Sequence, residues 1–229
     1  MILRTDAAHV RIVLQTDHAA IAAELARRWA EDFQPHAAVV LAAAMHDEGW
    51  RIWESAPDGL RSFLRMDPAV HAAFYAAGVD RVERLDRDAA LLCSLHASGL
   101  YNGAFGARQA PPETAVGTAL LAAEEARRAR LGPVDDNVWR NYRLLQTWDQ
   151  LALVICGHPL SRTAGGLAVV ASPMGRVTIA PWPFREGEVA LAVPYRRLPA
   201  GDWSDGQAFR QALADAPWQA DAVVLAPGP

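Results

Sequence analysis

The chain has 229 residues, of which 52% are hydrophobic and 21% are charged, so it can bury a substantial core and is globular rather than disordered. The net charge of −4 gives no electrostatic attraction to nucleic acid or to an anionic membrane, and we expect neither as a partner. All 22 basic residues are arginine, which excludes any mechanism that needs a catalytic lysine.

The sequence has the features of a cytoplasmic protein. Cys93 and Cys156 lie in apolar helical stretches, which is typical of small buried hydrophobic residues rather than of a disulfide. The first residues lack the apolar core of a signal peptide, and no stretch approaches the ~20 apolar residues of a membrane span. We therefore expect a cytoplasmic protein that acts without a membrane.

The first two thirds of the chain are predicted to be mainly helical. Residues 1–15 alternate weakly between apolar and polar side chains, which favours a short β-hairpin. Residues 50–66 are crowded with tryptophan, proline and arginine and are predicted to form an irregular loop. From N-cap residues, apolar spacing and stop signals, helices are expected over residues 16–32, 35–49, 67–86, 88–98, 111–131 and 135–156.

The last third changes in character. Strands separated by glycine and proline are expected over residues 167–171, 176–180, 188–195 and 222–226, with one helix over residues 205–216. The predicted fold is mainly α: a helical bundle with a small antiparallel β-sheet that the C-terminal segment forms with the N-terminal hairpin. Residues 1–160 would be a helical metal-binding domain, and residues 161–229 a small β-rich extension packed on it.

One short stretch, Met45–Gly49, indicates chemistry. It places His46 beside Asp47 at the end of an apolar helix, and adjacent helical residues point about 100° apart, so a large ion beside the helix can be reached by both. Four histidines of the chain, these being His18, His46, His71 and His96, are spaced at about one per helix and loop, as in metal sites built in helical bundles. Each histidine alone is more often a hydrogen-bonded core residue, but burying the whole set without a cation is costly. The candidate ligands are His18, His46, Asp47, His71, His96 and Asp149.

A family resemblance adds to this pattern. Gln15–His18, Met45–Gly49, Ser94–His96 and Thr147–Leu153 resemble the His…His-Asp…Asp pattern of the HD-domain superfamily, and the chain is similar to an uncharacterised bacterial HD-like family. The resemblance implies a bundle with one or two divalent ions (Fe, Mn or Zn) and, most often, phosphoester hydrolysis. It also implies that His18, His46, Asp47 and Asp149 are the core ligands, and that Asp47 bridges two ions if His71 and His96 hold the second.

The chain departs from the superfamily beside this site. Many HD phosphohydrolases have a phosphate-binding lysine after the glycine that follows the His-Asp pair, whereas this chain has Trp50 after Gly49. An arginine from the following loop could replace that lysine as a bidentate donor. The predicted catalytic group is Asp47, Glu48 and Arg51. The predicted substrate pocket is Trp50, Trp53, Arg61, Arg65 and Tyr101, although a role in the core is the favoured explanation for its three aromatic members.

These observations leave three functions open. The first is a metal-dependent hydrolase that uses a metal-activated water on a small phosphorylated molecule or nucleotide. The second is an HD-like diiron oxygenase acting on an organic substrate. The third is a metal-stabilised binding protein without turnover. All three take a small molecule as the partner, and a homodimer is compatible with each.

Overall fold

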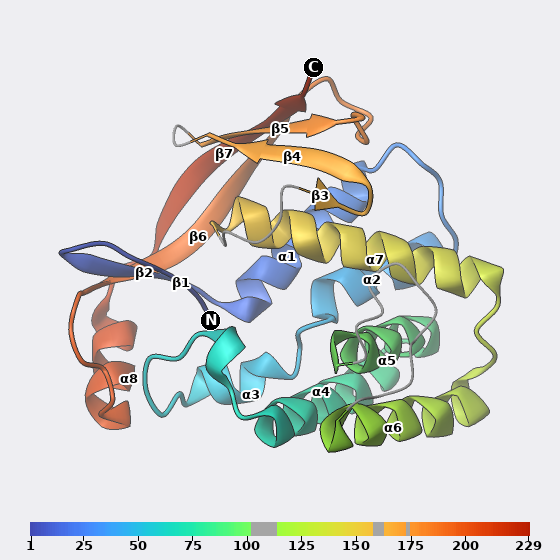
Figure 1. Ribbon diagram of the computed structural model, residues 1–229, viewed down its shortest axis with the longest axis horizontal. Coiled ribbons are helices and arrows are strands. Elements are labelled where there is room, and N and C mark those ends of the chain that lie inside the picture. The colour runs from blue at the N-terminus through green and yellow to red at the C-terminus, as the bar shows by residue number, and fades with distance from the viewer. Residues whose placement is uncertain (102–113, 158–162, 173–174) are drawn as a thin grey trace.

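The computed structural model describes residues 1–101, 114–157, 163–172 and 175–229, which form eight α-helices and one seven-stranded sheet (Figure 1). The helices are α1 (Gln15–Arg28), α2 (His36–Met45), α3 (Trp50–Ser55), α4 (Pro68–Glu83), α5 (Arg87–Tyr101), α6 (Ala115–Leu131), α7 (Asp136–Ile155) and α8 (Gly206–Asp215), with a short 3-10 helix at Phe63–Arg65. The strands are β1 (Ile2–Thr5), β2 (His9–Val13), β3 (Thr163–Ala164), β4 (Leu167–Ala171), β5 (Arg176–Ala180), β6 (Val189–Pro199) and β7 (Gln219–Pro227).

The sheet is larger than the sequence predicted, and the prediction of a mainly α fold with a small antiparallel sheet is wrong. The strand order is β1-β2-β6-β7-β5-β4-β3, and the sheet curls into a half-barrel, so the fold is mixed α/β. The pair β5–β7 is parallel, and the other strand pairs of the sheet are antiparallel. The strands form one large sheet because β6 is long: its eleven residues pair with β2 near one end and with β7 at the other. The N-terminal hairpin and the C-terminal strands are thereby joined, as the sequence suggested, but in one continuous sheet.

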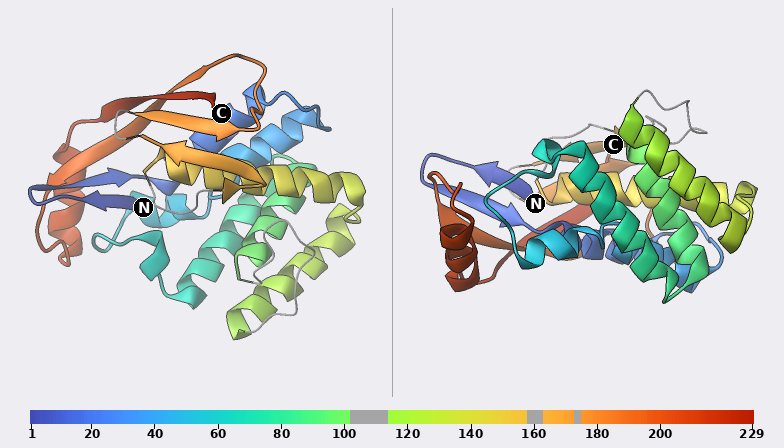
Figure 2. Two further views of the ribbon diagram at one scale, coloured as in Figure 1. Left: turned by 45° about the horizontal axis from the view of Figure 1, so that its top comes forward. Right: turned by 90° about the horizontal axis from the view of Figure 1, so that it is seen from below.

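The helices form two layers beside this sheet. In Figure 1 the sheet lies over α1 and α7, and contacts of α1 with β6 and of α7 with β3 and β4 join the two. Helices α4, α5 and α6 pack together on the side of the molecule away from the sheet (Figure 2). The core between sheet and helices is built of large hydrophobic side chains: Leu25, Leu145, Trp148, Ile179 and Val193 are each completely buried. This packing holds α1, α2, α5 and α7 around one point.

The start of α1 differs from the prediction. The helix begins at Gln15, and neither Thr16 nor Asp17 caps it; the N-cap residue is Leu14, which makes no side-chain cap. The carboxylate of Glu54 in α3 accepts hydrogen bonds from the backbone N–H groups of Gln15 (2.6 Å) and Thr16 (3.3 Å) instead. Because an anion satisfies the free donors at a helix N-terminus, α3 fixes the start of α1 from outside it.

Other element boundaries were also mispredicted. Helix α2 ends at Met45 and not at Gly49, and α3 lies within the segment that was predicted to be an irregular loop. The short strand β3 was not predicted, whereas β4 and β5 have the predicted bounds. The predicted helix start at Pro111 and the predicted stop at His158 lie outside the described residues.

A close backbone contact explains Gly49. Its φ is −60°, so it is right-handed and does not end a helix by a left-handed conformation. A Cβ atom at Gly49 would lie 2.0 Å from the carbonyl oxygen of Phe74, and one at Gly78 would lie 2.4 Å from the nitrogen of Gly49. Two glycines therefore let α4 cross directly against the turn that carries His46 and Asp47, which brings Tyr75 to that turn.

The described helices include none that is both long enough and apolar enough to cross a membrane. Cys93 and Cys156 are free and buried, as predicted.

Candidate metal centre

Polar side chains from three helices and one turn meet beneath the sheet. His18 comes from α1, His46 and Asp47 from the turn after α2, His96 from α5 and Asp149 from α7. The side chains of His18 and His46 are completely buried, and that of Asp47 is 3% exposed. His96 is equally buried, and the side chain of Asp149 is 14% exposed. Such burial of ionisable groups is unusual unless they are paired or bind a metal.

The ligand atoms lie close together. Nε2 of His46 is 3.6 Å from Oδ2 of Asp47 and 3.4 Å from Oδ1 of Asp149. Nε2 of His18 is 2.9 Å from Oδ1 of Asp149 and 3.9 Å from Oδ2 of Asp47. One ligand atom from each of His18, His46 and Asp47 lies within 4.8 Å of the other two, so these three residues could hold a metal ion. The imidazole of His96 adjoins that of His46, with ring centroids 4.8 Å apart.

These distances fit a coordination shell. Atoms bound about 2.1 Å from one ion are about 3.0 Å apart along an octahedral edge and about 3.4 Å apart in a tetrahedron. The spacings around Nε2 of His46 are therefore close to those of ligands around one ion. Two imidazoles and a carboxylate suit zinc, iron or manganese, in line with the sequence prediction of a divalent transition metal.

His46 has the orientation of a metal ligand. Its Nδ1 lies 2.9 Å from the carbonyl oxygen of Ala43, to which it donates a hydrogen bond. Metal-binding histidines commonly donate a hydrogen bond from the N–H of the ring nitrogen that does not bind the metal. This bond fixes the orientation of the ring and leaves the other nitrogen free to bind the ion. Nε2 of His46 is fully buried and has no hydrogen-bond partner among the residues that the structure describes. It is a buried polar atom that a cation would satisfy.

The charges of the site favour a cation. Burial lowers the pKa of His46, but the carboxylates of Asp47 and Asp149 outweigh it and raise the pKa to about 9. Burial raises the pKa of Asp149, but the hydrogen bond with His18 and the adjacent imidazole of His46 outweigh it and hold the pKa well below its usual range. Burial, with repulsion from His46, lowers the pKa of His96 to about 4. The two buried carboxylates thus favour the protonated, positively charged form of His46. A divalent ion at the same place would supply more positive charge than this one proton.

Two residues that the sequence did not indicate hold Asp47 in place. Tyr75 donates a hydrogen bond to Oδ1 of Asp47 (2.7 Å), and Gln15 donates one to Oδ2 (3.1 Å). Each carboxylate oxygen is thereby oriented from a different helix, as is usual for metal-binding carboxylates. Gln15 stands within a quoted segment of the resemblance, but nothing in the sequence signals Tyr75, since its position depends on the crossing of α4 over Gly49.

His71 lies apart from the group of three. Its Nδ1 is 2.5 Å from Oη of Tyr101, and its ring packs against Trp50 (4.9 Å between centroids) and Tyr75 (4.7 Å). Burial lowers the pKa of His71, which favours the neutral imidazole. The role of His71 as a ligand of a second ion stays a prediction.

Ion pairs with nearby carboxylates engage two of the predicted arginines in and after α3, Arg51 and Arg61. Arg51 binds both carboxylate oxygens of the buried Glu48, at 2.8 and 3.0 Å, and Arg81 also contacts Glu48. Arg61 pairs with Asp58 at 2.8 Å, where both side chains are exposed. Nε1 of Trp53 donates to the same Asp58.

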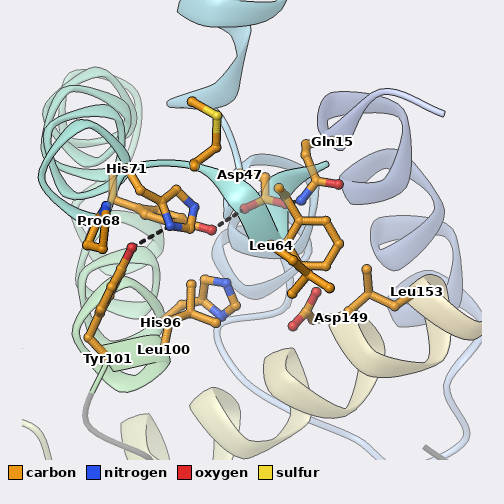
Figure 3. A pocket seen from close by; sticks show the side chains of 13 residues that line it. Gln15, Asp47, Leu64, Pro68, His71, His96, Leu100, Tyr101, Asp149 and Leu153 are labelled. Atoms are coloured by element: carbon orange, nitrogen blue, oxygen red, sulfur yellow. Dashed lines mark hydrogen bonds between the residues drawn. The ribbon is translucent and has the colours of Figure 1, made fainter. Parts of the chain in front are cut away.

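A cavity of about 300 Å³ opens onto the centre (Figure 3). Asp47, Asp149 and His96 form part of its wall together with His71 and Tyr101. Of the predicted pocket residues, Tyr101 lines this cavity, whereas Trp50, Trp53, Arg61 and Arg65 are not among its described lining residues. Trp50 and Trp53 lie in an apolar cluster with Phe209 of α8. The cavity gives a small molecule access to the candidate ligands.

Comparison with known proteins gives one match. Residues 1–200 match the model of a family described as a protein of unknown function, DUF3891. No curated protein and no solved structure matches the chain. The predicted similarity to an uncharacterised family is thus confirmed, while no finding links the chain to the HD superfamily.

Proposed function

The chain belongs to the DUF3891 family, whose function is unknown, and we propose from the site alone that it is a metal-dependent hydrolase of a small molecule. His18, His46 and Asp47 are the proposed ligands of a divalent transition metal, and Asp149 and His96 stand beside them. The observation that carries the proposal is Nε2 of His46, which is fully buried, has no hydrogen-bond partner in the described part of the chain, and lies 3.6 and 3.4 Å from two carboxylates that line a cavity.

The residues of the site have separable roles in this proposal. A divalent ion bound there would lower the pKa of a bound water and polarise the bond to be cleaved. Tyr75 and Gln15 hold Asp47 in one orientation, so that the ligand does not rotate during turnover. Asp149 and His96 line the cavity, where they can accept a hydrogen bond from the attacking water and orient it.

The expected phosphoester substrate has little support from the arginines. Arg51 and Arg61 are each paired with a carboxylate of their own segment, and Arg65 is exposed. None of the three is among the described residues that line the cavity. We therefore propose hydrolysis without assigning a phosphate-binding arginine.

An oxygen-activating diiron enzyme is the second candidate, and the apolar share of the cavity wall favours it. Leu64, Met66, Leu100 and Leu153 lie there, as suits an organic substrate. Aerobic purification, iron analysis and electron paramagnetic resonance separate the two: a mixed-valent diiron signal supports the oxygenase, whereas one redox-silent ion per chain supports the hydrolase.

Metal analysis of purified variants tests the proposal. We expect the wild-type protein to retain metal, and Asp47→Ala and His46→Ala to lose it, in plasma mass spectrometry. His9→Ala is the control, because His9 lies on β2 outside the site and its side chain is 46% exposed. Asp47→Asn, which keeps the shape of the side chain, distinguishes loss of the ligand from loss of the fold, since it should remain folded by circular dichroism.

The outcomes are distinct. Wild-type metal content in Asp47→Asn and His46→Ala would show that the cluster is a hydrogen-bonded polar core, and the proposal would be abandoned. Retained metal with no hydrolysis of esters, amides or phosphoesters would favour the binding protein without turnover. If His71→Ala also loses one ion per chain with the fold intact, the centre is dinuclear; unchanged metal content indicates a single ion.

A further inference from the structure

The side chains that line the cavity beside the centre limit the class of substrate that it can bind. Resting on the proposed function, we propose that the substrate is an uncharged carboxylic ester or amide with an apolar body, and not a phosphorylated compound. The centre would bind the polar acyl group, and the outer wall of the cavity would bind the apolar body.

The apolar residues of the wall come from two sides. The segment between α3 and α4 and the first turn of α4 form one side, and α5 and α7 form the other. These residues are Phe63, Leu64, Met66, Pro68, Leu100 and Leu153. Leu64 and Leu100 are 63% and 47% exposed, although large apolar side chains are usually buried. Two exposed leucines at the rim of a cavity are a surface that an apolar ligand would cover.

The charges of the cavity disfavour a phosphate group. Asp47 and Asp149 carry two negative charges, which one divalent ion would just neutralise. The described lining includes no arginine, and the chain has no lysine, so a phosphate dianion would enter a buried site without a compensating cation. An uncharged acyl group meets no such penalty.

The remaining polar groups of the wall suit a neutral substrate. His71 is oriented by Tyr101, and its buried Nε2 has no hydrogen-bond partner within the described part of the chain. Together with the hydroxyl of Tyr101 it offers a neutral hydrogen-bonding pair opposite Asp149 (Figure 3). Hydrolysis would add water across the acyl C–O or C–N bond, giving a carboxylic acid and an alcohol or amine, and needs no other reactant.

Metal-binding probes with and without an apolar body test this inference. The metal-replete protein is titrated by calorimetry with acetohydroxamic acid, benzohydroxamic acid and phenyl phosphate. We expect benzohydroxamic acid to bind about tenfold or more tightly than acetohydroxamic acid, because its ring would be buried against the leucines. We expect phenyl phosphate to bind more weakly than benzohydroxamic acid despite carrying the same ring.

Two matched variants locate the effect. Leu64→Asp should abolish most of the gain from the ring and leave the affinity for acetohydroxamic acid unchanged. Leu85→Asp should behave as wild type, since Leu85 is equally exposed at 63% but does not line the cavity.

The failures are distinguishable. If the protein holds metal but the ring gives no gain, or the gain survives in Leu64→Asp, or phenyl phosphate binds more tightly, then the substrate inference is wrong and the metal centre stands. If the purified protein holds no metal and takes none up, both proposals are overturned.

Discussion

Replacing Gly49 by alanine tests whether the backbone contact between α4 and the His46–Asp47 turn builds the site. The new Cβ would lie 2.0 Å from the carbonyl oxygen of Phe74, whereas real Cβ contacts are essentially never shorter than 3.0 Å, so α4 must retreat by about 1 Å. The backbone is the obstacle, and no flexible side chain can move aside. Overpacking of this kind costs about 1–3 kcal/mol, which for a chain of this size lowers the melting temperature by about 2–12 °C.

The same displacement should reach the centre. The hydrogen bond from Tyr75 to Asp47, 2.7 Å long, is carried by α4 and would be stretched as that helix retreats. We therefore expect Gly49→Ala to lower both the melting temperature and the metal affinity, measured by differential scanning calorimetry and by competition with a chelator. Gly187→Ala is the control, because a Cβ there has no heavy atom within 4 Å. Equal melting temperatures for the two variants would refute the proposed contact.

Two further predictions concern the ligands. Tyr75→Phe removes one hydrogen bond to Asp47 and should weaken metal binding about tenfold to a hundredfold without changing the stoichiometry, as measured by chelator competition; unchanged affinity would show that Tyr75 does not orient the ligand. In metal-free protein the pKa of His46 is about 9, above its usual 6.5, so the stabilisation from its proton is fully present below pH 6.5 and is lost as the pH rises through about 9. The melting temperature of metal-free protein should therefore fall between pH 6.5 and 9 more steeply in wild type and His9→Ala than in His46→Gln, and equal slopes would contradict this linkage.

The sequence was sufficient to single out three residues whose ligand atoms converge, but not to describe what holds them in place. His46 and Asp47 were singled out because they are adjacent at the end of an apolar helix, and His18 because it begins the preceding helix; their ligand atoms do converge. Their support by Tyr75 and Glu54 depends on contacts between helices distant in sequence. Those contacts follow from the Gly49–Gly78 crossing and from the position of α3, and no local pattern encodes either.

The sheet shows the same limit on a larger scale. Local alternation correctly predicted β4 and β5, because each strand has one buried face. The sequence did not reveal that β6 continues past residue 195 to Pro199, because Arg196 and Arg197 interrupt the apolar pattern there. A strand that is partnered on both edges keeps its conformation through residues that would weaken an isolated one, and this is why the extent of the sheet was underestimated.

The hydrogen bond between His18 and Asp149 joins residues that are 131 positions apart in the sequence. It can therefore form only after α7 has been synthesised. On a ribosome, the chain would expose His18, His46 and Asp47 for most of its synthesis, and these groups could bind ions loosely and unselectively. Only after α7 has emerged can Asp149 close the group, and the hairpin β1–β2 has no sheet partner until β6 follows. Selection of the right metal would thus have to wait for the folding of α7 and could not be made by the first helices alone.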